Sequence, residues 1–184
     1  SRLAKVKKSM DQKNMDVIIL TDPSNMHYLT GYDGWSFYVP QGIIVSLNLD
    51  EPIWFGRRQD SKGAKVTTYL QDKNIIYYQE DLIQSPPTHP YDFVSSFIHE
   101  NNWANKNIGV EMDAYYYTAE NHYRLTSTCP NVNFSDATLL VNWIRLIKSE
   151  NKITYMKEGA KLVEAGMQTA YENIKPGVKQ SYVA

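Results

Sequence analysis

The sequence predicts an α/β fold in which a mixed β-sheet is covered by helices on both faces. Short apolar runs, typical of buried strands, alternate with helical patterns along most of the chain. Two of these runs, within residues 42–49 and 52–55, are separated by a short turn, as in a hairpin. Alternating strands and helices favour parallel pairing, and the hairpin adds an antiparallel pair, so we expect a mixed sheet.

The first half of the chain carries clear signals for the ends of its elements. Asp22 can cap a short helix whose first turn begins at Pro23, and Gly31 can end that helix. An irregular aromatic loop follows at residues 32–41. The other expected elements are a basic helix at 1–14 with Leu3, Val6 and Met10 on one face, strands at 16–20, 42–49 and 52–55, and a helix at 59–68.

The second half of the domain repeats the alternation. Residues 85–90, SPPTHP, cannot be regular and are expected to form a loop. The last helix of the domain should bury its apolar side chains. The expected elements are strands at 74–78, 107–111 and 132–134, and helices at 91–101, 117–127 and 137–147, the last with Leu140, Trp143, Ile144 and Ile147 inside.

A long helix near the C-terminal end of the sequence indicates how the chain is divided. From Ile153 to Ile174, apolar or small residues recur at alternating steps of three and four, Ser149 stands where an N-cap belongs, and Pro176 stops the helix. One interpretation is a terminal helix that packs on its own domain. We favour the other, in which residues 1–148 form one domain and residues 149–184 are a linker and the first helix of a second domain that this chain does not contain.

Composition excludes several classes of partner. The 184 residues carry a net charge of −1, with acidic and basic residues interspersed, which favours neither a nucleic-acid nor a membrane partner. The apolar fraction of 42% is typical of a folded domain. One cysteine, no apolar run of bilayer length and no signal-peptide pattern together predict a cytoplasmic protein.

The densest set of candidate metal ligands is Glu111, Asp113, Glu120 and His122. Metal-dependent hydrolysis needs carboxylates and usually a histidine that converge on one or two ions. Glu120 and His122 are two positions apart on a predicted helix and therefore point in different directions. We expect an edge carboxylate and solvated helix residues at these positions, and no catalytic metal ligands in this chain.

Two other reactive motifs are set aside. The first strand leads into TDPSN, without the glycines that bring backbone amides close to a phosphate, so a nucleotide-binding protein is disfavoured. Cys129 precedes Pro130 at a helix end, and the sequence suggests no histidine that could activate its thiol. We expect it to be a packing residue.

The aromatic loop is the main candidate for a binding surface. Trp35, Phe37 and Tyr38 lie between two well-bounded elements, and aromatic groups on such a loop suit a ligand wall or a protein interface. The alternative is a local cluster that folds back onto the sheet. Arg57 and Arg58, after a strand end, could bind a substrate carboxylate bidentately or could be solvated.

Several motifs resemble those of the creatinase/prolidase family of metallohydrolases with the pita-bread fold. NMHYLTGY, followed by the aromatic loop and a strand, resembles the family's N-terminal domain, and RLIKSENKITYMKEGAKLVEAG resembles its linker and the first helix of its catalytic domain. The stretches DGWSFYVPQG, FGRRQDSKGA, GVEMDAYYYTA and ATLLVNWIR are more similar to the ectoine-hydrolase branch than to standard Xaa-Pro dipeptidases.

This resemblance implies a ribonuclease H-like N-terminal domain without catalytic metal ligands. The family's two divalent ions (Mn, Co or Zn) are bound by two aspartates, one histidine and two glutamates of the catalytic domain. The family is usually dimeric, and its N-terminal domain walls the partner subunit's active site through a loop that matches Trp35 to Val39. Val39 replaces an arginine that some relatives use there.

Two functions are therefore expected from the resemblance. In the first, the chain is a non-catalytic domain that contributes to dimerisation and to the substrate-site wall of an enzyme that cleaves a C–N bond in an ectoine-like molecule or an Xaa-Pro dipeptide. In the second, it is a stand-alone peptide- or protein-binding module of a catalytically dead relative.

Overall fold

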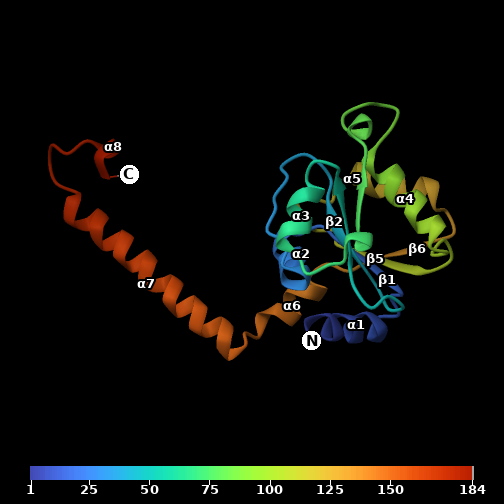
Figure 1. Cartoon of the computed structure of the whole chain (residues 1–184), viewed down its shortest axis with the longest axis horizontal. Coiled ribbons are helices and arrows are strands. Elements are labelled where there is room, and N and C mark those ends of the chain that lie inside the picture. The colour runs from blue at the N-terminus through green and yellow to red at the C-terminus, as the bar shows by residue number, and fades with distance from the viewer. Residues whose placement is uncertain (184) are drawn as a thin grey trace. The chain divides into compact units, whose positions relative to one another are not determined.

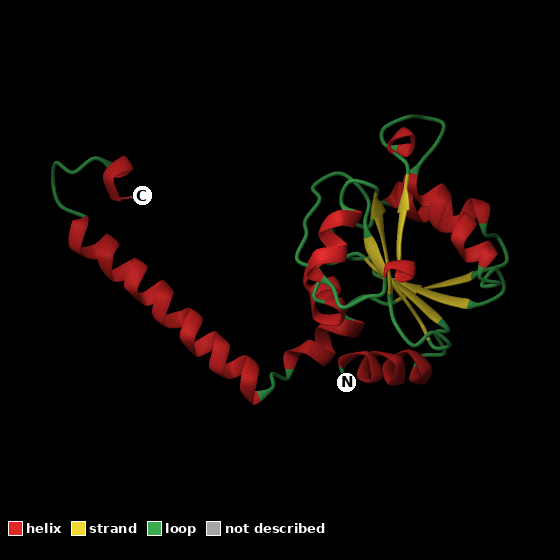
Figure 2. Cartoon of the chain, viewed as in Figure 1, coloured by secondary structure: helices red, strands yellow, loops and turns green. Residues whose placement is uncertain are grey.

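A six-stranded sheet forms the centre of the domain, in the order β4-β3-β2-β1-β5-β6. The computed structural model describes residues 1–183. The strands radiate in one twisted layer between the helices (Figure 2). Their bounds are β1 Val17–Leu20, β2 Gly42–Ser46, β3 Ile53–Arg57, β4 Ile75–Tyr78, β5 Asn107–Val110 and β6 Asn133–Asp136.

The sheet is mixed because β2 is reversed. It pairs antiparallel with both β1 and β3, whereas β1 with β5, β5 with β6, and β3 with β4 pair in parallel. The expected hairpin is therefore β2–β3, and the other described strands run in one direction. One consequence is that the carboxyl ends of β1, β3, β4 and β5 lie at the same edge of the sheet as the start of β2.

Helices cover both faces of the sheet, as the sequence predicts (Figure 1). One core contains Val6 and Met10 of α1, Met26 of α2 and the inward residues of the strands. The other contains Tyr91 and Val94 of α4. The first face is covered by α1 (Arg2–Gln12), α2 (Pro23–Thr30), α3 (Ser61–Thr67) and α6 (Leu140–Leu146), and the second by α4 (Pro90–Glu100) and α5 (Ala119–Thr128).

The ends of α2 confirm the expected capping. The Asp22 carboxylate accepts hydrogen bonds from the backbone N–H groups of Ser24 and Asn25 at 2.8 and 3.0 Å. Pro23 occupies the first turn, where no amide hydrogen is needed. Gly31 ends the helix with φ of 83°, a left-handed conformation that other residues rarely adopt. These local signals place the start of the aromatic loop.

The apolar residues of α6 were only partly assigned correctly from the sequence. Leu140 is buried and Ile144 packs against the core, as expected. Trp143 and Ile147, expected inside, are exposed to 67% and 83%. Only the face that carries Leu140, Val141 and Ile144 meets the sheet, so Trp143 lies on another face of the helix. Ile147 follows the last helical residue, Leu146.

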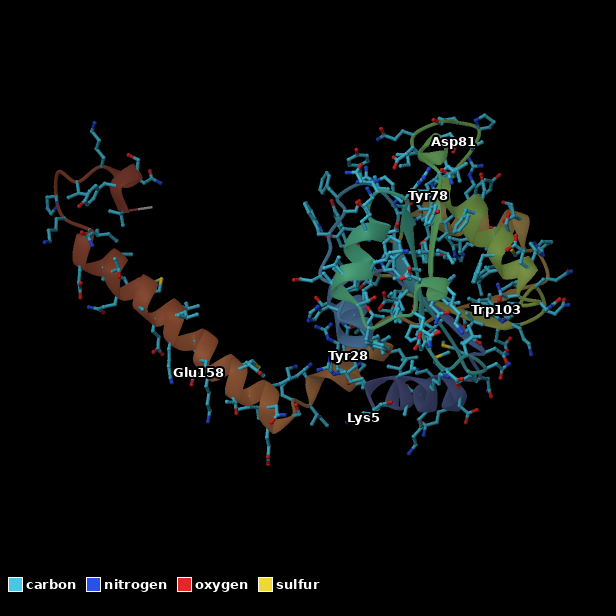
Figure 3. The ribbon with its side chains drawn as sticks, viewed as in Figure 1. Lys5, Tyr28, Tyr78, Asp81, Trp103 and Glu158 are labelled. Atoms are coloured by element: carbon cyan, nitrogen blue, oxygen red, sulfur yellow. The ribbon has the colours of Figure 1, made fainter. Side chains whose placement is uncertain are left out.

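A second compact unit begins at Leu146, and the first spans Ser1–Arg145. The main element of the second unit is α7 (Glu150–Asn173), which contains no buried residue. The Ser149 hydroxyl caps this helix by accepting a hydrogen bond from the backbone N–H of Lys152. Side chains project around this helix, Glu158 among them (Figure 3). The remaining short helices are α8 (Gln180–Val183) in this unit, and the 3₁₀ turns η1 (Asp72–Asn74) and η2 (Glu80–Leu82) in the first.

Within residues 1–183, no helix combines the length and the apolar character that crossing a bilayer requires.

Candidate functional site

The aromatic loop reaches the sheet edge where the parallel strands end. Its side chains Trp35, Phe37 and Tyr38 are exposed to 65%, 63% and 61%, so they do not fold back onto the sheet. The rings of Trp35 and Phe37 are tilted against each other with centroids 5.9 Å apart. Ser36 and Val39, in the same loop, are buried. The loop thus presents a contiguous aromatic surface on an anchored backbone.

Both ends of the loop are held by side chains of the domain. The Tyr32 hydroxyl donates to Oε1 of Gln41 at 2.8 Å, which joins the first and last residues of the loop. The Tyr78 hydroxyl donates to the carbonyl of Pro40. Tyr78 lies inside the domain, below the loop that carries Asp81 (Figure 3). Because these hydroxyls are bonded and buried, the loop's shape does not depend on a ligand.

The middle of the loop is held by a residue from elsewhere in the chain. The indole Nε1–H of Trp35 donates to the hydroxyl of Tyr116 at 2.7 Å. Tyr116 lies between β5 and α5, and its ring packs edge-on against that of Tyr115 with centroids 5.3 Å apart. The exposed tryptophan is therefore oriented by a specific hydrogen bond.

A cleft of about 500 Å³ opens beside the loop. It is bounded by the aromatic loop, by the segment before α4, and by the segment before α5. Its lining contains aromatic, amide and hydroxyl side chains and one imidazole, but no lysine, arginine, aspartate or glutamate. The lining residues are Phe37, Tyr38, Val39, Pro40, Gln41, Ile83, Gln84, His89, Pro90, Tyr115, Tyr116, Thr118 and Asn121.

His89 is the only imidazole in that lining, and its ring is fixed by helix capping. Nδ1 accepts a hydrogen bond from the backbone N–H of Tyr91 at 3.1 Å, while the backbone N–H of His89 donates to the Asp92 carboxylate at 2.8 Å. Since Nδ1 is an acceptor, the proton of the neutral ring is on Nε2. Burial, and then the positive charge of Arg124, lower the pKa of His89 below 6.5, so the ring is neutral at pH 7.

The two arginines predicted as carboxylate ligands lie at the end of β3 but outside the cleft lining. The guanidinium of Arg57 forms a bidentate pair with Asp60, through Nε at 3.1 Å and Nη2 at 3.0 Å. Arg58 lies 6.0 Å from the centre of the Tyr77 ring. A role for either in binding a substrate stays a prediction, and Arg57 would first have to release Asp60.

Glu111 is buried, which corrects the expectation of an edge carboxylate. Its Oε2 accepts hydrogen bonds from the backbone N–H groups of Thr21 and Asp22 at 2.7 and 2.9 Å, and its Oε1 accepts one from Asn25 at 2.5 Å. Arg145 in turn donates to Oδ1 of Asn25 at 2.7 Å. Burial raises the pKa of Glu111, although these hydrogen bonds oppose the shift. The carboxylate joins β5 to the start of α2.

The other candidate metal ligands have separate partners. Glu120 accepts from Nε of Arg124 at 2.7 Å, and Nδ1 of His122 lies 3.0 Å from the Tyr117 hydroxyl. Asp113 is exposed. Within residues 1–183, no three His, Cys, Asp or Glu side chains are grouped so that they could hold an ion. These residues therefore do not fit a two-metal site.

Cys129 is buried, as expected, and His99, which the sequence did not connect with it, lies close to its thiol. Nε2 of His99 lies 3.6 Å from the thiol sulfur and 3.1 Å from the carbonyl of Thr128. A carbonyl only accepts, so Nε2 carries a proton and donates it there. In that tautomer the same nitrogen cannot take the thiol proton.

The Creatinase/Prolidase N-terminal domain matches residues 2–147. The chain belongs to this family. An ectoine hydrolase of Halomonas elongata is 41% identical over 98% of this chain and 45% of its own length. An uncharacterized hydrolase/peptidase of Sinorhizobium fredii is 46% identical over 100% of this chain and 47% of its own length. The chain thus spans about half the length of these relatives.

Solved structures agree on the fold. An Xaa-Pro dipeptidase from Bacillus anthracis superposes with a TM-score of 0.74 at 19% identity, over 99% of this chain and 45% of that one. The N-terminal domain of the cytoplasmic peptidase PepQ from Mycobacterium tuberculosis has a TM-score of 0.57 at 14% identity, over 77% of this chain and 95% of that one. The creatinase/prolidase assignment and the α/β architecture expected from the motifs are both confirmed.

Several residues of the cleft lining, His89 and Tyr116 among them, were not singled out from the sequence. His89 could have been found, because a polar residue before Pro90 with an aspartate at position 92 is the pattern of a capped helix. Tyr116 could not, since the residue it orients lies 81 positions away and no local pattern connects them.

Proposed function

We propose that this chain is the non-catalytic N-terminal domain of a metal-dependent hydrolase that acts as a homodimer, and that its aromatic loop walls the substrate site of the partner subunit. The parent enzyme would cleave a C–N bond in a small cytoplasmic substrate, either ectoine-like or an Xaa-Pro dipeptide. Two divalent ions, Mn, Co or Zn, would be bound by the catalytic half.

The observation that carries this proposal is the exposed, braced aromatic loop beside an uncharged cleft. A monomeric domain gains little from exposing Trp35, Phe37 and Tyr38 together, and such surfaces are typical of binding sites. Aromatic walls exclude water and orient a small ligand, while the groups that grip its charges can come from another part of the enzyme. The 41% identity to an ectoine hydrolase supports a C–N hydrolase as the parent.

We also propose that residues 149–184 are the linker and the first helix of the catalytic domain. The family match ends at residue 147, and α7 has a complete apolar stripe without a buried residue. Hydrogen exchange across residues 153–174 tests this. We expect weak protection in the monomeric chain, or protection that appears only on association. Protection equal to that of the sheet in a proven monomer would assign α7 to this domain.

Mixed dimers of the full-length enzyme test the role in the partner's site. One subunit carries Phe37→Ala, and the other lacks a metal ligand in its catalytic half. In this dimer the single metal-competent site should keep its activity, because the loop that faces it comes from the metal-deficient subunit and is intact. When both changes are in the same subunit, the mutated loop faces the intact site, and activity should be lost. Activity that does not depend on this placement would rule out the role in trans and favour a stand-alone binding module.

A further inference from the structure

We propose that Asn25 is a positioning residue that holds the last turn of α6, where the first unit of the chain ends, against α2 and the residue that follows β5. The side chains of Asn25, Glu111, Asn142 and Arg145 form this latch. The inference rests on the proposed function, because the latch would fix how the domain that carries the aromatic loop is joined to the catalytic half.

The side-chain amide of Asn25 is completely buried, and both of its polar atoms have partners. Nδ2 donates to Oε1 of Glu111 at 2.5 Å and to Oδ1 of Asn142 at 2.7 Å. Oδ1 accepts from Nη1 of Arg145 at 2.7 Å. A carboxylate only accepts and a guanidinium only donates, so these two partners fix the orientation of the amide.

The position of Asn25 requires both a donor and an acceptor at the end of a short side chain. An aspartate in its place would put a second carboxylate beside Glu111. A leucine would leave the carboxylate and the Arg145 guanidinium without this partner. Asn25 therefore connects an acidic and a basic side chain that come from different segments of the chain.

Apolar packing holds the first turn of α6 more firmly than the last. Val141 is buried, whereas Leu146 is exposed to 62%. In the last turn, Arg145 donates to Asn25 and its Nη1 also lies 4.0 Å from Oδ1 of Asp22. Hydrogen bonds of fixed direction define one position of the turn, whereas apolar contacts tolerate small shifts. The latch therefore sets where the chain leaves the first unit.

Arg145 and the aromatic loop line the same cavity. This cavity has a volume of about 460 Å³, and its lining combines Arg145 with residues 32–35 of the loop and with Pro23, Ser24 and His27 of α2. The end of α6 and the first half of the loop are therefore neighbours. A loosened latch would change the surroundings of the loop and the exit of the chain together.

NMR relaxation of this chain tests the latch. Arg145→Met removes the donor and keeps a long unbranched side chain. The backbone order parameters of residues 143–146 should fall from about 0.85, typical of a rigid backbone, toward about 0.6, while those of the sheet should not change. A residue that only stabilises the fold would lower the free energy of unfolding and leave the native order unchanged. That result would overturn the proposal.

Lys106→Met is the matched control. Lys106 lies 3.8 Å from Asp16, and their side chains are exposed to 42% and 37%, close to the 4.0 Å and the 28% and 37% of Arg145 and Asp22. This variant also removes a cation from a partly exposed ion pair, but it does not touch the latch. The order parameters of α6 should stay the same. A fall there would assign the effect to the charge of the domain and contradict the latch.

A double-mutant cycle tests whether Asn25 connects the two charges. Glu111→Gln keeps the length of the side chain and removes its charge, so it disturbs the fold less than truncation does. Each variant should raise the unfolding equilibrium constant. Together with Arg145→Met, the increase should be at least about threefold smaller than the product of the single increases, because an amide that has lost one partner no longer holds the other. Equality with the product would overturn the role of Asn25.

Mixed dimers of the full-length enzyme extend the test to the role in the substrate site. With Arg145→Met in the metal-deficient subunit, the loop that faces the intact site belongs to the subunit with the broken latch, and kcat/KM should fall about threefold or more. With Arg145→Met in the metal-competent subunit, the fall should be smaller. A fall that does not depend on this placement would mean that the latch only stabilises the subunit that carries it.

These experiments separate a failure of this inference from a failure of the proposed function. The order parameters and the double-mutant cycle need neither a metal nor a partner subunit. If both behave as expected while the effect of Phe37→Ala does not depend on placement in the mixed dimers, only the proposed function fails. If the effect of Phe37→Ala depends on placement but Arg145→Met leaves the order of α6 unchanged, only this inference fails.

Discussion

Two regions at the same edge of the sheet differ in how their polar groups are used. Above β1 and β5, Glu111 is buried and accepts three hydrogen bonds, and Asn25 connects it to Arg145. Above β2, β3 and β4, the cleft has no charged lining, and its aromatic side chains are exposed. The first region holds charges that are already paired, and the second presents groups that can still bind something.

This difference shows that clustered carboxylates are a poor guide to the site in this domain. Glu111 belongs to the densest set of candidate metal ligands in the sequence, yet its oxygens are occupied by backbone amides and Asn25. An engaged carboxylate stabilises the fold but cannot also bind a ligand without leaving donors unpaired.

The largest effect is expected for Glu111→Ala. It would leave the amides of Thr21 and Asp22 and the side chain of Asn25 without their acceptor, which should lower the free energy of unfolding by about 3 kcal/mol or more. Urea denaturation measures this directly. Asp113→Ala, two residues away and exposed, is the control and should change stability by less than about 0.5 kcal/mol. Similar values for the two variants would remove the distinction between the regions.

The next largest effect concerns the aromatic loop beside the cleft and should be seen in catalysis. In the full-length enzyme, Phe37→Ala should lower kcat/KM about tenfold, or about 1.4 kcal/mol, because the aromatic wall is lost. The side chain is exposed to 63%, so the unfolding free energy of the domain should change by less than about 1 kcal/mol. An unchanged kcat/KM would mean that the loop has only a structural role.

A smaller effect is expected when the brace of the loop is removed. Tyr116→Phe deletes the hydroxyl that accepts from the Trp35 indole and keeps the ring. The indole hydrogen of Trp35 should exchange with solvent faster, while those of the buried Trp54 and Trp103 should not change. The loss of stability should stay near or below about 1 kcal/mol, as for one partly exposed hydrogen bond. Unaltered exchange at Trp35 would mean that this bond does not hold the loop.

The smallest effect is a dependence of stability on pH through His89. Its pKa is lowered in the folded state, by burial first and then by Arg124. The unfolded chain therefore binds the proton more readily, and the free energy of unfolding should rise with pH between the lowered pKa and 6.5. Protonation would turn Nδ1 into a donor facing the amide of Tyr91, so acidification weakens the cap. Solvent screening keeps this contribution small.

Urea denaturation of the wild type and of His89→Asn at several pH values through that window measures the contribution. The asparagine cap does not titrate, so the free energy of unfolding of the wild type minus that of His89→Asn should decrease as pH falls. A constant difference would show that the imidazole titrates equally in the folded and unfolded states.

The parts of the fold that were predicted from sequence depend on local signals. Asp22 and Gly31 define the ends of α2 through their own backbone preferences, and the apolar runs at β1 and β2 are recognisable without their partners. Contacts that join distant segments were missed. The hydrogen bond between Glu111 and Thr21 spans 90 residues, and the one between Trp35 and Tyr116 spans 81. No local sequence pattern in one segment identifies its partner in the other.

The face of α6 was wrong for a related reason. An apolar pattern predicts that a helix has an inner side, but the position of the sheet decides which residues occupy it. Trp143 was therefore assigned to the core although Leu140, Val141 and Ile144 fill it. The aromatic loop was predicted correctly in position because its boundaries are local, while the bonds that hold its shape are not.

The reversed strand β2 also has a consequence for the order of folding. It forms a hairpin with β3 within a short stretch of chain, whereas β1 must wait for β5 before Glu111 can reach Thr21. Closing that long loop costs more chain entropy than closing the hairpin, so we expect the β1–β5 contact to form after the rate-limiting step. Glu111→Ala should then accelerate unfolding far more than it slows folding, which stopped-flow measurements in urea can resolve.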